Sequence, residues 1–210
     1  MFKKIKFIKC RNKRESEKQC INDFGKVLKS RNYNFFYFSG GKSLINILKG
    51  IKKNLNNKKQ YYLTDERIVL TKKNSNYHNL KRFFVNLNFY DLKKLLLIKN
   101  KKIKLINDVK NIPNPDILLM GIGEDGHVAS IFKKKNTKKN FFICKNKYEK
   151  FSRLSISEFK ILKAKKIFFF ISSLKKKEFV NRIKHHNFSK KTAFERICYY
   201  FNKKINIYYF

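Results

Sequence analysis

Short apolar runs alternate along this chain with longer amphipathic segments. Five runs have the length and the aromatic or branched content of buried strands, at residues 35–38, 61–64, 116–120, 167–171 and 205–210. Segments with helical spacing accompany them, at residues 43–55, 76–86, 157–165 and 174–184. Alternating strands and helices predict an α/β fold: a Rossmann-like, mostly parallel sheet flanked by helices on both faces.

The length of the chain limits it to one domain. It has 210 residues, of which 42% are hydrophobic, including 22 Phe and 11 Tyr. That is enough for one substantial core and too little for two ordinary ones, so we predict a single domain over residues 1–210.

Chemically unusual residues follow four of the predicted strands. Ser39-Gly40-Gly41 follows the first, Asp65-Glu66-Arg67 the second, residues 121–127 the third, and Ser172-Ser173 the fourth. The carboxyl ends of parallel strands share one edge of a sheet, where ligands of such folds bind. We therefore expect four loops that together form one site.

The net charge of +38 raises the question of a polyanionic partner. The basic residues are mostly Lys, 44 of 52, and they are spread along the whole chain. Asn, Ile, Phe and Tyr are also abundant, and all these residues have AT-rich codons. Mutational drift and a selected nucleic-acid surface therefore both remain open. Because the chain has no RNP1-like run, zinc finger or concentrated basic arm, no specific nucleic-acid partner is expected.

The cysteines and the apolar runs bear on cofactors and location. Cys10, Cys20, Cys144 and Cys198 are widely separated and have no metal-binding spacing. We expect reduced thiols, no metal site and no cofactor. Neither a signal-peptide apolar region nor a run long enough to span a membrane is present in the sequence, so we expect a cytoplasmic protein with no membrane contact.

Residues 38–43 combine a strand end, a glycine pair and the start of a helix. Gly40 and Gly41 let the backbone approach an anion, and amide groups of the next helix, with the Ser43 hydroxyl, can donate to it. Ser39 and Lys42 complete a candidate phosphate cradle. An ordinary strand-to-helix turn would have the same pattern, and the spacing matches neither a Walker loop nor a G-x-G-x-x-G fingerprint.

Residues 120–127, M-G-I-G-E-D-G-H, are more specific. Gly121, Gly123 and Gly126 permit a tight loop that brings backbone amides against a ligand. Asp125 and His127 flank a glycine, so the carboxylate can orient an imidazole that exchanges protons near neutral pH.

Residues 121–132, G-I-G-E-D-G-H-V-A-S-I-F, closely resemble the G-x-G-x-D-G-H-x-A-S-L-F signature of 6-phosphogluconolactonases, in the glucosamine/galactosamine-6-phosphate isomerase superfamily. Other motifs of these enzymes have counterparts in the same order. They are an S-G-G turn at 39–43, a D-E-R-x-V segment at 65–69 followed by S-N at 75–77, an R-[VI]-[TS]-[LI]-[TS] strand at 153–157, and a G-x-x-K segment at 173–176.

The resemblance implies hydrolysis of 6-phospho-D-glucono-1,5-lactone, a small sugar-phosphate lactone, by a monomer or weak homo-oligomer. It implies that His127 is the general base on a water molecule and that Asp125 orients it. Arg153 and Lys176, with Lys42 and Ser43, would hold the 6-phosphate, and Asp65 and Arg67 would line the sugar end. Backbone amides of Gly40–Gly41 or Gly121–Gly123 would donate to the phosphate or the oxyanion.

Several positions depart from the family pattern. Leu44, Leu70 and Lys133 stand where the family usually has Pro, and Ser173 replaces the Gly of G-x-x-K. These changes remove rigidity but no chemical group, although they leave a decayed, inactive member as one alternative.

A glucosamine-6-phosphate deaminase or isomerase is another alternative. Its loop resembles D-G-H-I-A-F-N-E-P, with a Glu that joins the proton relay, whereas V-A-S-I-F follows His127 here. The segment Asp65-Glu66-Arg67 also differs from the D-E-Y type of the isomerases. Both features favour the lactonase.

Overall fold

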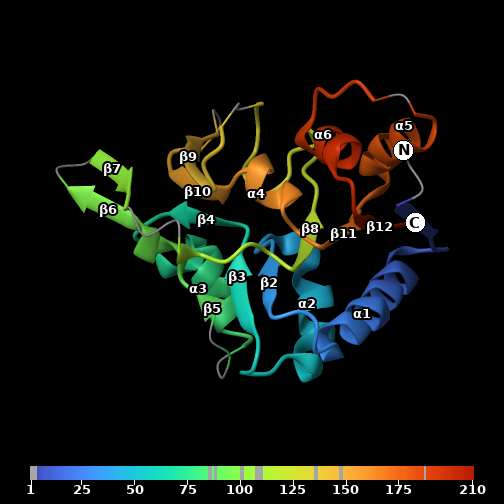
Figure 1. Cartoon of the computed structure of the whole chain (residues 1–210), viewed down its shortest axis with the longest axis horizontal. Coiled ribbons are helices and arrows are strands. Elements are labelled where there is room, and N and C mark those ends of the chain that lie inside the picture. Colours follow the sequence, from blue (N-terminus) through green and yellow to red (C-terminus); the bar gives the residue numbers. More distant parts are fainter. Residues whose placement is uncertain are drawn as a thin grey trace.

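A seven-stranded sheet, with every strand parallel to its neighbours, forms the centre of the computed structural model (Figure 1). The structure describes residues 4–84, 87, 89–99, 102–106, 111–134, 137–146, 149–186 and 188–210. In spatial order the strands are β1 (Ile5–Lys9), β12 (Lys204–Tyr209), β11 (Lys166–Phe170), β8 (Ile117–Gly121), β2 (Phe35–Phe38), β3 (Gln60–Leu63) and β5 (Phe89–Tyr90).

Helices cover both faces of this sheet, as predicted. On one face, Phe24 of α1 (Lys13–Lys29) contacts Phe168 of β11, with ring centroids 5.0 Å apart. On the other face, Phe194 of α6 (Ala193–Tyr200) contacts Phe169, with centroids 4.8 Å apart. Because side chains alternate along a strand, these two neighbouring Phe residues point to opposite faces. The apolar side chains of both layers form one connected core.

The remaining helices fill these two layers. α2 (Ile45–Ile51) packs against α1, whereas α4 (Glu158–Leu162) and α5 (Lys177–Lys184) pack against α6. α3 (Asn76–Lys81) lies beside β4. Short 3-10 turns occur at Lys42–Leu44, Lys52–Asn54, Lys72–Asn74, Leu92–Leu95 and Leu174–Lys176.

Two small antiparallel sheets add to the central one. The first contains β4 (Asp65–Ile68), β10 (Ser152–Ile156) and β9 (Phe141–Lys145). The second is a hairpin of β6 (Leu96–Lys99) and β7 (Lys102–Leu105), which projects at one end of the molecule (Figure 1). The assignment of Asp65-Glu66-Arg67 to a loop is thus wrong. These residues form β4, because Arg67 and Glu66 pair with Arg153 and Leu154 of β10.

The predicted strands agree with β2, β3, β8, β11 and β12 to within one residue at each end. The helix expected at 174–184 is present as a 3-10 turn followed by α5, and the one at 43–55 is α2 between two 3-10 turns. The helices expected at 157–165 and 76–86 are shorter, as α4 and α3, and residues 85–86 lie outside the described part of the chain.

The order of the strands places a crevice at the middle of the sheet. From β2 the chain continues to β3 and β5 on one side, and later to β8, β11 and β12 on the other. The connections that leave β2 and β8 therefore diverge, and open α/β sheets bind ligands at such a switch point. The Gly40–Gly41 turn and Gly121 flank this point, because Phe38 of β2 pairs with Leu119 of β8.

Candidate active site

A cleft of about 290 Å³ opens at the carboxyl ends of β2, β3, β8 and β11. Ten of the thirteen residues predicted to form a site line it. They are Ser39, Gly41, Ser43, Asp65, Arg67, Gly121, Gly123, His127, Arg153 and Lys176. The described lining does not include Gly40, Lys42 or Asp125. Segments far apart in the sequence therefore converge on one cavity.

The loop after β8 holds His127 against the backbone. Gly123 N donates to His127 O at 2.9 Å, and Gly126 N donates to Gly123 O at 3.2 Å, so the loop closes on itself. A side chain at Gly123 would lie only 2.1 Å from Cε1 and Nδ1 of the imidazole. Gly126 has φ +77°, a left-handed conformation that glycine adopts readily. Both glycines are thus needed for the position of His127.

Asp125 lies behind the imidazole rather than in the cleft. Its Oδ1 is 2.5 Å from Nδ1 of His127 and also accepts the backbone N–H of His127 at 3.2 Å. Burial acts to raise the pKa of Asp125, but the charge and hydrogen bonds of His127 outweigh it and lower the pKa below its usual range. The carboxylate therefore stays ionised and binds Nδ1. Nε2 is then the ring nitrogen that remains for contacts on the other side of the imidazole.

Phe132 connects this pair to the next group of charges. Its ring lies 4.8 Å from the imidazole of His127, and the guanidinium carbon of Arg153 lies 5.7 Å from the same ring. One aromatic side chain thus separates the imidazole from the guanidinium.

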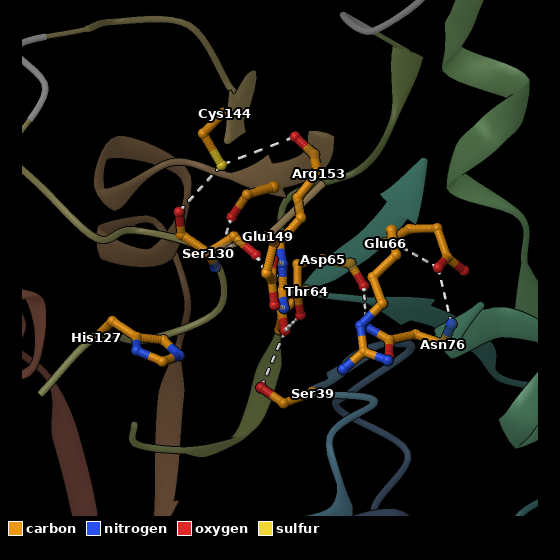
Figure 2. A network of polar contacts seen from close by, with 12 residues as sticks. Ser39, Thr64, Asp65, Glu66, Asn76, His127, Ser130, Cys144, Glu149 and Arg153 are labelled. Carbon is orange, nitrogen blue, oxygen red and sulfur yellow. Dashed lines mark hydrogen bonds and ion pairs between the residues drawn. The ribbon is translucent and has the colours of Figure 1, made fainter. Parts of the chain in front are cut away.

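Arg153 forms a buried network with two carboxylates (Figure 2). Its Nη1 lies 3.3 Å from Oδ2 of Asp65, and Ser130 Oγ donates to the same carboxylate oxygen at 2.7 Å. Its Nε donates to Glu149 Oε2 at 2.7 Å, and its Nη2 donates to the other oxygen of Glu149. Burial alone would lower the pKa of Arg153, but the bonds to Glu149 and the charges of both carboxylates raise it.

The other two cations of the cleft have no carboxylate partner within the described residues. Lys176 is buried and donates to Ser172 Oγ at 3.1 Å. Burial lowers its pKa, against the opposing charges of Glu124 and Asp125. Arg67 donates to the carbonyl of Asn74 at 3.3 Å, and its buried Nε has no partner among the described residues. Both cations are free to bind an anion or a hydroxyl.

The Ser39-Gly40-Gly41 turn contributes in two ways. A Cβ at Gly40 would lie 2.7 Å from Cβ of Asn76, so glycine is required there by packing. A Cβ at Gly41 would meet no atom within 4 Å, because this residue faces the open cleft. Ser39 Oγ lies 3.0 Å from Thr64 Oγ1 and joins the turn to the end of β3. Lys42 is exposed and begins a 3-10 turn.

Sequence reasoning missed several residues around the cleft. Asn76, Glu124, Leu44, Ile122 and Ala129 line it, and Glu149 lies behind Arg153. Asn76 belongs to the S-N motif at residues 75–77, so the sequence contained a pattern that could have identified it. Its position depends on buried Glu66, which accepts the backbone N–H groups of Asn76 and Tyr77 and the Ser75 hydroxyl. Burial raises the pKa of Glu66 despite these hydrogen bonds.

Neither a metal-binding cluster nor a membrane-spanning helix occurs among the described residues. No group of three or more His, Cys, Asp and Glu side chains there is arranged to hold a metal ion. In the same part of the chain, every helix is too short or too polar to cross a membrane.

Comparison with solved structures shows the same fold in three 6-phosphogluconolactonases. That of Trypanosoma brucei has a TM-score of 0.77 at 16% identity, with 99% of this chain and 96% of that chain covered. That of Trypanosoma cruzi has 0.76 at 18% identity, covering 99% and 94%. That of Thermotoga maritima has 0.72 at 17% identity, covering 97% and 98%. At these identities the likeness establishes the fold alone.

The sequence comparisons give the family. A search of curated protein sequences yields no significant match. A family model described as glucosamine-6-phosphate isomerases/6-phosphogluconolactonase matches residues 13–197, from the start of α1 into α6. Since this match spans most of the chain and the fold agrees with it, the chain belongs to the glucosamine-6-phosphate isomerase/6-phosphogluconolactonase family.

Proposed function

We propose that this chain is a 6-phosphogluconolactonase, which hydrolyses 6-phospho-D-glucono-1,5-lactone to 6-phosphogluconate in the oxidative branch of the pentose phosphate pathway. One observation carries the proposal: His127, held by Asp125, borders the same cleft as Arg67, Arg153 and Lys176. A lactone is an activated ester, so its hydrolysis needs a positioned water, a base and stabilisation of the oxyanion. The family, the fold and the cleft all support a sugar-phosphate substrate.

His127 acts as the general base in this mechanism. Asp125 holds Nδ1, so Nε2 takes a proton from a water molecule while its oxygen attacks the lactone carbonyl carbon. The bond between that carbon and the ring oxygen then breaks, and the imidazolium returns the proton to the ring oxygen. The products are a free carboxylic acid and a hydroxyl group, and His127 is restored.

The cations of the cleft hold the substrate in place. Arg153 and Lys176 bind the 6-phosphate together with the Ser43 hydroxyl and the Gly40–Gly41 backbone, because charged hydrogen bonds are roughly twice as strong as neutral ones. Asp65 and Arg67 face the sugar end, where the guanidinium of Arg67 can bind a hydroxyl. Backbone amides of the Gly121–Gly123 segment would stabilise the oxyanion, apart from Gly123 N, which donates to His127 O. Lys42 is exposed and lies outside the described lining, so it contributes to the charge near the cleft rather than to a direct phosphate contact.

The loop after His127 favours hydrolysis over the isomerase reaction. That reaction would need a carboxylate in the stretch that follows the histidine, and residues 128–132 are V-A-S-I-F. Val128 and Ile131 are buried, and Ser130 is bound to Asp65. This turn therefore supports the cleft wall instead of a proton relay.

A direct assay tests the proposal. The purified chain should hydrolyse 6-phosphogluconolactone faster than its spontaneous rate in the presence of a chelator, with no added cofactor. Glucosamine 6-phosphate in a parallel reaction should release no ammonia. Lactone hydrolysis at the spontaneous rate, or turnover of the amino sugar, would overturn the assignment.

Other properties follow as proposals from the same family. The chain is expected to act in the cytoplasm, as one domain over residues 1–210 and as a monomer or weak homo-oligomer. Gel filtration with light scattering checks the last of these.

A further inference from the structure

The guanidinium of Arg153 is already bound to three side chains in this structure. All three of its nitrogen atoms donate to partners: Nε and Nη2 to the two oxygens of Glu149, and Nη1 to Asp65 and Ser130. The Nε–Nη2 edge is one of the forks with which arginine binds a phosphate at two points. Glu149, which is not among the described residues that line the cleft, therefore holds the edge of the guanidinium that a two-point phosphate contact would need.

Carboxylates are concentrated at this cleft in a chain that has few of them. Only 14 residues are acidic, against 52 basic ones. Five of the 14 lie in or behind the cleft wall: Asp65, Glu66, Glu124, Asp125 and Glu149. Three have other tasks, because Glu66 binds backbone amides, Asp125 binds His127 and Asp65 binds Ser130. Glu149 has no comparable task, since its carboxylate is directed at Arg153 alone among the described side chains.

We propose that Glu149 sets the affinity and charge specificity of this cleft by competing with phosphoryl groups for the guanidinium of Arg153. The proposal deepens the function proposed above and rests on it for the identity of the phosphorylated ligand. The ligand class it predicts is a phosphate monoester dianion.

The competition selects for charge. A ligand with one carboxylate would only exchange the Glu149 carboxylate on Arg153 for an equivalent group, so its free energy of binding would be small. A phosphate dianion brings a second charge and a third oxygen, which can reach Lys176 while the fork of Arg153 is exchanged. When the phosphorylated product leaves, Glu149 returns to Arg153, which avoids leaving a buried charge unpaired. Glu149 thus weakens the binding of substrate and product alike. Turnover benefits because a product that binds more weakly is released faster.

Inorganic phosphate is the probe for this competition. Calorimetric titration of the full chain at fixed salt should show that Glu149→Gln binds phosphate roughly tenfold more tightly than the original chain, about the contribution of one charged hydrogen bond. Glu158→Gln is the matched control, because Glu158 forms a similar two-point pair with Arg196 away from the cleft. It removes the same charge and should leave phosphate affinity within about twofold.

A double variant tests whether the gain acts through Arg153. In an Arg153→Gln background, Glu149→Gln should give no further tightening, since the contested guanidinium is absent. A gain that persists there, or a Glu149→Gln single variant with unchanged or weaker phosphate binding, overturns the proposal. If Glu149→Gln does not fold, Glu149→Asp replaces it: the shorter side chain breaks the two-point contact, and tightening below about threefold overturns the proposal.

This test is separable from the test of function. Phosphate binding involves no turnover, so a chain without lactonase activity whose Glu149→Gln variant still binds phosphate more tightly would overturn the lactonase assignment and support the competition. An active chain with no change in phosphate affinity would do the reverse.

Discussion

Asp125 and His127 are the residues on which the proposed chemistry depends most. His127→Ala should lower kcat by about 10² to 10⁴, the usual contribution of a general base, and should change KM little because the phosphate contacts remain. Steady-state lactone hydrolysis, corrected for the spontaneous rate, measures both constants. An unchanged kcat would remove His127 from the mechanism.

Arg153 is expected to act on binding and not on chemistry. Arg153→Ala should raise KM for the phosphorylated lactone much more than for the unphosphorylated lactone, since only the former uses the guanidinium. Parallel assays on the two lactones measure this ratio. Equal losses on both would contradict a phosphate role.

Gly123 and Gly41 provide a steric comparison within the cleft. In Gly123→Ala the new methyl group would lie 2.1 Å from two imidazole atoms, so His127 must move away from Asp125 and kcat should fall at least tenfold. In Gly41→Ala the methyl group meets open space in the cleft, so the fold is undisturbed and the main effect should be a higher KM. Kinetics of both variants, with circular dichroism to check folding, decide this. A Gly123→Ala variant with normal kcat would show that the loop can adjust.

The residues found from the sequence are those with distinctive local patterns. His127, Asp125 and the glycines follow from one short segment, which the fold keeps together. Glu149 has no such pattern: it precedes its partner Arg153 of β10 by four residues, and the other carboxylate of the network, Asp65 in β4, is 88 residues from Arg153. Only the antiparallel pairing of β4 with β10 brings these charges together.

Among the secondary-structure elements, α4 carries an unusual buried charge. Lys160 is fully buried and donates to the carbonyls of Ile112 and Pro113, with Tyr37 and Phe141 rings beside its Nζ. Burial, helped by the charge of Lys163, lowers the pKa of Lys160 to about 8. The ammonium is therefore easier to deprotonate in the folded chain than in the unfolded one.

This shift predicts how stability depends on pH. Between about pH 8 and pH 10 the unfolded chain holds the Lys160 proton more tightly, so the free energy of unfolding should rise with pH, by on the order of 3 kcal/mol for a shift from 10.5 to about 8. Lys160→Met should flatten this rise. Lys49→Met, on the exposed side of α2, should retain it. Urea unfolding at several pH values measures the slope, and identical slopes in all three chains would refute the assignment to Lys160.

The elements found from the sequence are the buried strands, because their apolar runs are continuous in a sheet covered on both faces. The longest helix, α1, was not predicted, since charged residues interrupt its apolar stripe and only five of its 17 residues are buried. Its start depends on the Asn12 side chain, which accepts the Glu15 backbone N–H. The strand β4 was taken for a loop because Asp65-Glu66-Arg67 is polar, and its pairing with β10 is a long-range contact that the local sequence does not encode.

At the scale of the whole molecule, acidic and basic residues are unevenly distributed. The net charge is +38, yet acidic residues gather around the cleft and offset its three cations. The cleft is thus electrostatically different from the rest of the surface, where Lys residues lack enough acidic partners. Phosphate selection in the cleft then depends on local pairs such as Arg153–Glu149, and not on the overall field.

The dependence on salt concentration distinguishes non-specific binding at the Lys-rich surface from phosphate recognition in the cleft. Binding of a labelled single-stranded RNA to the Lys-rich surface should weaken by about 10² or more between roughly 50 and 200 mM salt, because each neutralised phosphate releases counterions. Over the same range kcat for the lactone should stay constant and kcat/KM should fall by less than about fivefold, because a buried pair is screened much less than an exposed one. Fluorescence anisotropy and the lactone assay in identical buffers measure the two quantities. RNA binding that survives at 200 mM salt would instead indicate a selected nucleic-acid surface, because drift in composition supplies charge without the base contacts that resist salt.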